Sequence, residues 1–217
     1  MNLDIELNNY LQVARGLYQT GPSHDFSHVE RVYKLALMIG RKEKANLRII
    51  GVAALFHDLG RAEEAESEGE ICHAIAGAEI TARILKDHNE DPEFIRRVCE
   101  CISTHRFRKE NKPRTLEAKC LFDADKLDSL GAVGVARAYL WLGERGGTVY
   151  VSREVWEKTD FKSNRPEDDS LQREWFIKLR LIPKQLFTAT AIKIAAKRVR
   201  TLKNFLKTLE REVNGEE

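Results

Sequence analysis

The chain has 217 residues, of which 42% are hydrophobic and 32% are charged. These values are typical of a globular protein that is long enough to bury a hydrophobic core without disulfide or zinc cross-links. The formal net charge of +2 is close to balance, so the composition gives no reason to expect a nucleic-acid partner or a membrane surface.

The chain begins with MNLDIELNNY, which carries acids where a secretion signal would carry Lys or Arg. No apolar run approaches the roughly 20 residues that a membrane-spanning helix needs. The four cysteines are not arranged as a disulfide framework. These features predict a cytoplasmic protein that does not associate with membranes.

Apolar residues recur at helical spacing nearly throughout the chain, and no long stretch alternates as a strand would. The predicted helices cover about 3–18, the segment after TGPSHDFSH to about 44, 45–59, 70–86, the segment after Asp91 to about 105, 115–142, and one or two segments within 171–213. Asp91 and Pro92 form a typical helix start, with a capping side chain followed by proline at the first helical position.

Three local features complete this prediction. Gly60 is expected to end the helix at 45–59 in a left-handed conformation. The acidic, aperiodic stretch RAEEAESEGE is expected to be a solvated loop, and the turn-rich residues 143–170 an irregular insertion. We therefore predict an all-α helical bundle that forms a single domain of residues 1–217. Its core covers about 20–145, followed by the insertion at about 143–170 and C-terminal helices at 171–213.

Six polar residues fall on the inward faces of the predicted helices, at otherwise apolar positions. They are His28, His57, Asp58, His73, His105 and Asp125. A single histidine on an apolar face is usually a hydrogen-bonded core residue, but buried carboxylates are costly unless they are paired, hydrogen-bonded or bound to a metal. A bound cation accounts for all six residues at once.

The adjacent pair His57–Asp58 adds a geometric condition. Neighbouring residues of a helix point about 100° apart, so both can face one ion only if the ion lies beyond the helix end. Nitrogen and oxygen donors without a thiolate favour an octahedral ion, Mn²⁺, Ni²⁺, Fe²⁺, Co²⁺ or Mg²⁺, over structural zinc.

Three segments together carry a resemblance to a known family: HDFSHVERV, HDLG and DADKLDSLGAVGVAR. Their order resembles that of the HD superfamily of metal-dependent phosphohydrolases, which has a helical fold. The match covers roughly residues 20–145. It is closer to a bacterial and archaeal branch in which some members are nucleoside triphosphate pyrophosphohydrolases.

The resemblance implies that His28, His57, Asp58 and Asp125 are the metal ligands. In two-metal relatives, the positions of His73 and His105 bind a second ion, whereas one-metal relatives use such positions near the substrate phosphate. The expected catalytic residues are Asp58, His73 and His105, with Asp58 orienting the attacking water. Arg61 and Ala62 replace a Glu-Asp pair, which argues against hydrolysis of the stringent-response nucleotide.

Basic residues near this set are candidates for contact with a substrate. They are Arg106 and Lys109, in the loop after His105, and Arg31, one helical turn beyond His28. An exposed basic loop without a substrate role remains an alternative for the first two.

Together these observations favour a hydrolase that converts (d)NTPs to a monophosphate and pyrophosphate. One alternative is a phosphohydrolase for another small phosphomonoester or diester. The other is a non-enzymatic module that binds a metal or a nucleotide. The expected partner is a small phosphorylated molecule, not a nucleic acid.

Overall fold

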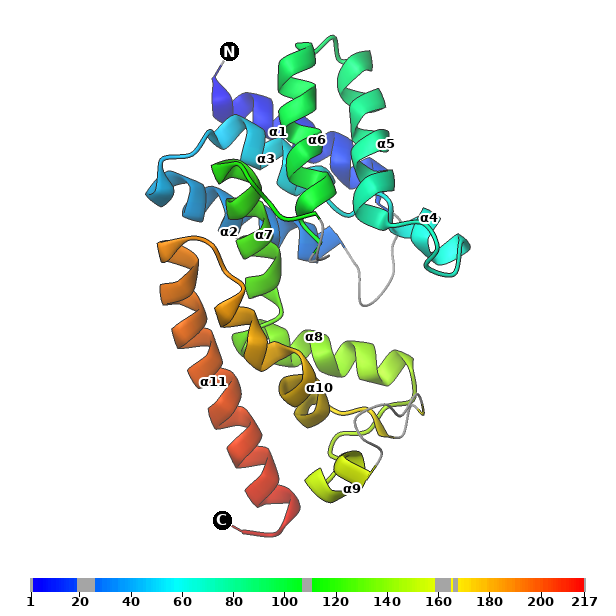
Figure 1. The fold of residues 1–217 in the computed structure, drawn as a ribbon, viewed down its shortest axis with the longest axis vertical. Helices are drawn as coiled ribbons and strands as arrows, with labels where there is room; N and C mark the ends of the chain where they lie inside the picture. Colours follow the sequence, from blue (N-terminus) through cyan, green and yellow to red (C-terminus); the bar gives the residue numbers. More distant parts are fainter. Residues whose placement is uncertain (1, 19–25, 107–110, 159–164, 166–167, 217) are drawn as a thin grey trace. The chain divides into compact units, whose positions relative to one another are not determined.

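A computed structural model of the chain describes residues 2–18, 26–106, 111–158, 165 and 168–216. Helices form all the regular secondary structure of these residues (Figure 1), which confirms the predicted all-α class. The contacts divide the chain into a first unit, Met1–Asp125 with Phe187–Ala191, and a second unit, Lys126–Leu186 with Ile192–Glu217.

The first unit contains six helices and most of a seventh. They are α1 (Leu3–Leu17), α2 (Phe26–Glu43), α3 (Leu47–Phe56), α4 (Arg61–Glu66), α5 (His73–Asp87), α6 (Pro92–Thr104) and α7 (Leu116–Asp128).

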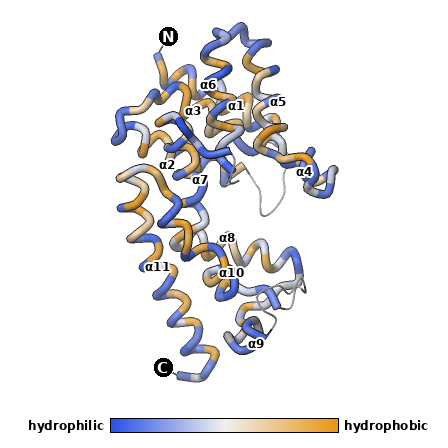
Figure 2. Tube along the Cα trace, in the orientation of Figure 1, coloured by the Kyte–Doolittle hydropathy of each residue, from blue (hydrophilic) through white to orange (hydrophobic). Residues whose placement is uncertain are grey.

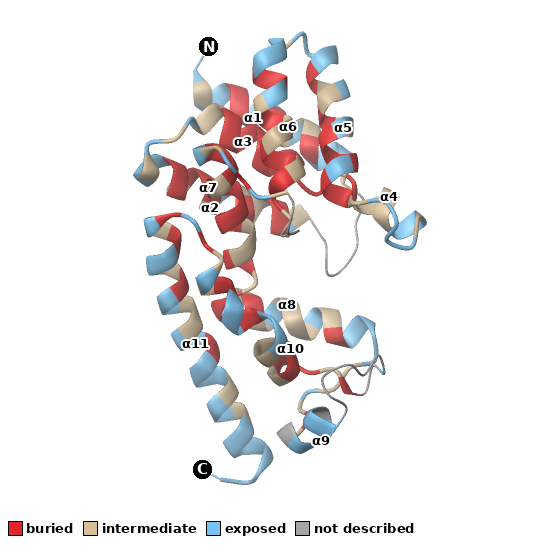
Figure 3. Ribbon diagram, in the orientation of Figure 1, coloured by how far each residue is buried: buried red, intermediate tan, exposed pale blue. Residues whose placement is uncertain are grey.

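Helix α3 forms the core of the first unit. It contacts α1, α2, α5 and α6, and every residue from Ile49 to Phe56 is buried (Figure 3). A helix that is apolar on all sides is stable only when other elements surround it. Consequently, whatever follows Phe56 begins inside the unit, away from water.

A side chain caps the start of α3 and another caps the start of α6, and the second of these caps was predicted from the sequence. Asn46 accepts hydrogen bonds from the backbone amides of Arg48 and Ile49, and Asp91 accepts them from those of Glu93 and Phe94. The predicted start of α6 is therefore confirmed. Each cap satisfies backbone donors that have no partner within the helix.

Two predictions about helix positions were wrong. The acidic stretch after Gly60 contains α4, which packs against α5. The helix predicted at 115–142 is two helices, because α7 ends at Asp128 and α8 (Gly131–Glu144) begins at Gly131 with a φ of +75°. Apolar periodicity does not reveal such a break, because the spacing continues across it.

Contacts within the second unit hold the break between α7 and α8. The Arg198 guanidinium donates to the Leu127 carbonyl at 2.5 Å, which satisfies an acceptor at the end of α7. Arg137 of α8 donates to the buried Asp128 carboxylate at 2.9 Å. A Cβ on Gly131 would lie 3.0 Å from the Arg198 side chain, so this position favours glycine for its space as well as for its φ.

The second unit also contains α9 (Arg153–Lys158), α10 (Leu171–Ile177), the 3₁₀ helix η2 (Leu179–Lys184) and most of α11 (Ala189–Val213). Helix α10 contacts α8, α9 and η2. Helix α11 alternates apolar and basic positions (Figure 2), with Leu202 buried and Lys203 exposed. Among the described residues, no helix combines the length and the apolar character needed to cross a membrane.

A charged cluster around Arg48 links three elements of the first unit. Arg48 Nε donates to Glu6 Oε1 of α1 at 2.6 Å, and its Nη2 donates to Glu90 at 2.7 Å. The guanidinium lies 3.7 Å from the centre of the Phe94 ring of α6, and the Tyr10 hydroxyl also donates to Glu90. Charge-assisted hydrogen bonds of this kind are stronger than neutral ones.

We predict that Arg48→Ala lowers the free energy of unfolding by about 1–3 kcal/mol, because it removes the guanidinium that pairs with the buried Glu6 and the half-buried Glu90 carboxylates. Denaturant unfolding followed by circular dichroism measures this change. Arg96→Ala is the control, since the Arg96–Glu93 pair is exposed and its loss should change stability little. Equal effects of the two substitutions would contradict the role given to Arg48.

Candidate metal centre

His57 and Asp58 lie in the turn that directly follows α3. The helix ends at Phe56, and His57 keeps a helical backbone conformation as its C-cap. The side-chain Nδ1 of His57 lies 2.9 Å from the Ala54 carbonyl and donates to it. This hydrogen bond leaves Nε2 as the unprotonated nitrogen of the neutral ring. As the sequence predicted, the adjacent pair meets at a helix end.

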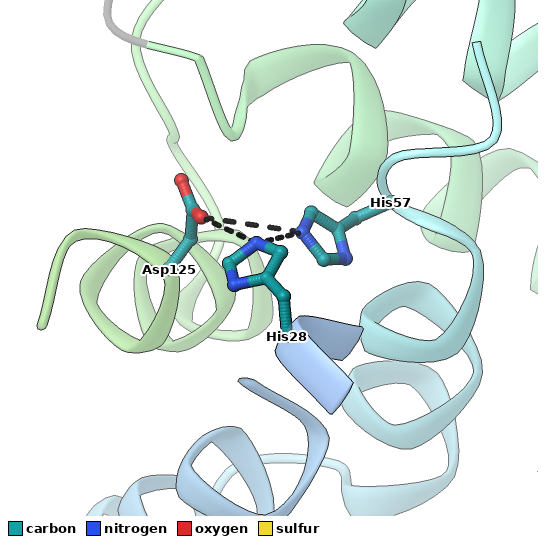
Figure 4. Close-up of side chains that lie close together, drawn as sticks. All are labelled: His28, His57 and Asp125. Atoms are coloured by element: carbon teal, nitrogen blue, oxygen red, sulfur yellow. Dashed lines mark hydrogen bonds and ion pairs between the residues drawn. The ribbon is translucent and has the colours of Figure 1, made fainter. Parts of the chain in front are cut away.

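A first group of donor atoms surrounds His57 Nε2. His28 of α2 and Asp125 of α7 point toward it (Figure 4), with His28 Nε2 3.4 Å from His57 Nε2 and 3.5 Å from Asp125 Oδ1. Asp58 Oδ2 lies 3.6 Å from the Nε2 atom of His28 and 3.6 Å from that of His57. Donors about 2.1 Å from one octahedral ion lie roughly 3–4.2 Å apart, so this group has the spacing of a coordination shell.

A second group of donor atoms faces the other oxygen of Asp58. His73, at the start of α5, and His105, just after α6, have their Nε2 atoms 3.2 Å apart, and each lies 3.5 Å from Asp58 Oδ1. The Nδ1 of His105 donates to the Ile102 carbonyl at 2.6 Å. Asp58 therefore lies between the two groups, with one oxygen toward each.

The chemistry of this donor set fits a divalent cation. Asp58 is only 4% exposed, and its Oδ2 lies 3.6 Å from the Nε2 atoms of His28 and His57, so a buried carboxylate oxygen and two imidazole nitrogens converge on one place. Burial lowers the pKa of His57 and of His73 to about 4, so both rings are neutral and able to act as ligands at pH 7. Burial would raise the pKa of Asp58, but its neighbours His57 and His105 and the Arg61 guanidinium hold it well below its ordinary value.

Glu64 of α4 belongs to this site and was missed in the sequence, where it lies in a stretch read as a loop. Its Oε2 accepts a hydrogen bond from His73 Nδ1 at 2.7 Å, which leaves His73 Nε2 facing Asp58. The Arg106 guanidinium also pairs with Glu64. Glu63 and Glu66 lie in the same acidic stretch, so nothing in the sequence distinguished Glu64 from them.

Tyr18 was also missed. The backbone amide of Asp58 donates to the Tyr18 hydroxyl at 3.3 Å, and burial raises the pKa of this phenol. Tyr18 thus holds the backbone of the turn that carries His57 and Asp58. A tyrosine at the end of an amphipathic helix is ordinarily a core residue, so its sequence context gave no signal.

Three basic residues were predicted to contact the substrate, and the structure describes two of them. Arg31 lies on α2 one turn beyond His28, and its guanidinium donates to Ser27 Oγ at 2.7 Å. Arg106 lies beside His73, in its pair with Glu64. Lys109 lies outside the described residues.

Gly60 sets the distance between the His57–Asp58 turn and α5. Its φ is −84°, so the predicted left-handed conformation was wrong. A Cβ at this position would lie 2.3 Å from the His73 carbonyl and 2.6 Å from the Gly77 nitrogen. The glycine is needed because the first turn of α5 passes directly against it, which brings His73 beside Asp58.

The fold and the site define an all-α protein with a buried histidine–aspartate centre, and comparison with known proteins identifies its family. The HD domain model matches residues 25–130. YpgQ of Bacillus subtilis is 31% identical over 196 residues, which cover 88% of this chain and 85% of YpgQ. The chain therefore belongs to the HD domain family.

Two solved structures resemble the whole chain. The crystal structure of Bacillus subtilis YpgQ in complex with ADP has a TM-score of 0.74 at 27% identity, and the match covers 96% of this chain and 98% of that one. A predicted HD superfamily hydrolase from an uncultured Thermotogales bacterium has a TM-score of 0.65 at 28% identity, with 98% and 99% covered.

We predict that Gly60→Ala destabilises the first unit by about 1–3 kcal/mol, because α5 must move away from the added methyl group. The measurement is the midpoint of chemical unfolding. Gly16→Ala in α1 is the matched control, since its added Cβ meets nothing within 4 Å and alanine favours a helix. If Gly60→Ala were as stable as Gly16→Ala, the close approach of α5 would not constrain this position.

Proposed function

We propose that this chain is a metal-dependent phosphohydrolase that converts nucleoside or deoxynucleoside triphosphates to the monophosphate and pyrophosphate. The observation that carries the proposal is the two-sided environment of Asp58. One of its oxygens faces His28 and His57, and the other faces His73 and His105.

We assign His28, His57, Asp58 and Asp125 as the residues that would hold one divalent ion, Mn²⁺, Ni²⁺, Fe²⁺, Co²⁺ or Mg²⁺. Such an ion, when bound, supplies Lewis-acid chemistry that activates water at neutral pH and neutralises charge on phosphoryl oxygens. The protein fixes the donors through hydrogen bonds behind them, such as the one from His57 to the Ala54 carbonyl.

We assign the second group of donor atoms, around Asp58 Oδ1, to the catalytic steps. Asp58 Oδ1 is turned away from the proposed ligands and can orient a water molecule. The Nε2 atoms of His73 and His105 lie on the same side and can take up a proton from the attacking water, and the protonated rings can then donate hydrogen bonds to the phosphate. Burial of this side chain cluster excludes competing water, which strengthens each of these interactions.

The charge around Asp58 supports one ion instead of two. Arg61 Nε lies 3.1 Å from Asp58 Oδ1, the oxygen that a second ion beside His73 and His105 would use. A guanidinium at this distance already neutralises that oxygen and repels another cation.

A nucleotide substrate is supported by the relative that was crystallised with ADP and by the basic residues near the site. We propose that Arg31, Arg106 and Lys109 contact the phosphates. Arg106 lies next to His73 in its pair with Glu64, where a phosphate could share the guanidinium.

We predict that Asp125→Ala loses both the bound ion and the activity, because it removes a ligand. His73→Ala and His105→Ala should retain the ion but lose about 10²–10⁴-fold in kcat, as is typical when a proton-transfer or phosphate contact is lost. Metal analysis beside steady-state kinetics with a dNTP tests each variant. Two ions in the wild type and one in either histidine variant would contradict the one-ion assignment, and full activity without metal would end the proposal.

The bond that is cleaved is tested by phosphorus NMR of a dNTP digest. Pyrophosphate and the monophosphate should appear together as the first products, because the proposed reaction breaks the bond between the α and β phosphates. Orthophosphate as the sole first product would rule this reaction out and favour a different phosphohydrolase.

A further inference from the structure

The second unit contains a pocket of its own, with a volume of about 310 Å³. Residues of α10 and α11 and the segment at Tyr150–Val151 line it, and none of them belongs to the candidate metal centre. Its volume is at the lower end of the range for small-molecule sites. The pocket is therefore large enough for a small ligand but not for a long polyphosphate chain.

One side of the pocket is aromatic. Tyr150, Trp175 and Phe176 line it, and all three side chains are half-buried. Aromatic rings in the wall of a pocket are suited to stacking against another planar ring, and such stacking is how proteins hold nucleobases without reading their sequence.

The part of the pocket that α11 contributes carries net positive charge. Lys203 and Lys207 are one helical turn apart on α11, so they share a face, and both are exposed. Lys203 Nζ lies 5.8 Å from the centre of the Trp175 ring, which places an ammonium group beside the aromatic wall. Glu210 lies one further turn along and provides a single carboxylate.

Gln172 of α10 gives the pocket an unused hydrogen-bonding group. Its amide nitrogen and oxygen are both buried, and neither has a hydrogen-bond partner among the described residues. An enclosed amide without partners is unfavourable. A change of rotamer toward the pocket would let the amide donate and accept at once, as glutamine does at the edge of an adenine.

We propose that this pocket binds a nucleoside monophosphate, with the base on Trp175, the base edge on Gln172 and the phosphate on Lys203 and Lys207. Glu210 would accept hydrogen bonds from the ribose hydroxyls. Two lysines and one carboxylate complement a monophosphate, and the Gln172 amide then has hydrogen-bond partners. This site is independent of the reaction proposed for the first unit.

The test uses the full chain carrying Asp125→Ala, in buffer with EDTA, and measures AMP binding by isothermal titration calorimetry. One saturable site in the micromolar to millimolar range is expected. Lys203→Ala with Lys207→Ala should weaken AMP binding at least tenfold. The control is Lys193→Ala with Lys197→Ala, which removes the same charge from exposed positions of α11 outside the pocket and should leave binding unchanged.

Ribose 5-phosphate is the second probe and should bind at least tenfold more weakly than AMP, because it has no base. Circular dichroism checks that each variant is folded. The proposal is overturned if AMP shows no saturable binding, if both lysine pairs weaken it equally, or if ribose 5-phosphate binds as well as AMP. It is also overturned if a short oligonucleotide binds far more tightly than AMP, since the surface would then serve nucleic acid.

Discussion

The Asp58 carboxylate lies at the end of a helix that is buried on every side, and a charge in this position needs polar or charged groups close to it. Most of the unusual features of the first unit meet this requirement. Four imidazoles and one guanidinium come from different segments to lie within 3.6 Å of its two oxygens. The close approach of α5 at Gly60 and the ordering of His73 by Glu64 serve the same arrangement. Without the Asp58 carboxylate, these imidazoles and the guanidinium would have no common group to contact.

The three aspartates of the DADKLD segment make three different kinds of contact. Asp123 is fully buried and accepts hydrogen bonds from the backbone amides of Phe187 and Thr188, where α11 begins. Asp125 joins His28 and His57. Asp128 pairs with Arg137. Of the three carboxylates, the middle one is placed to bind an ion, while Asp123 holds the segment before α11 and Asp128 holds the end of α7.

The all-α class and most helix positions could be predicted from the sequence, because apolar periodicity records which face of each helix is buried. The six inward polar residues could be found for the same reason, since a polar residue in an apolar stripe is visible as an interruption. Glu64 and Tyr18 could not be found. One lies among other acids at the surface and the other looks like core, and their roles depend on which segments meet in space. The role of Gly60 likewise depends on α5, a neighbour that is not adjacent in the sequence.

The four proposed ligands are widely separated along the chain, from His28 to Asp125, and come from three segments: α2, the turn after α3, and α7. No short fragment of the chain can therefore assemble the set, and unfolding of the first unit disperses it. An ion held by these residues would be linked thermodynamically to the folding of this unit. The concentration of the free ion would then set the free energy of unfolding of this unit as well as its chemistry.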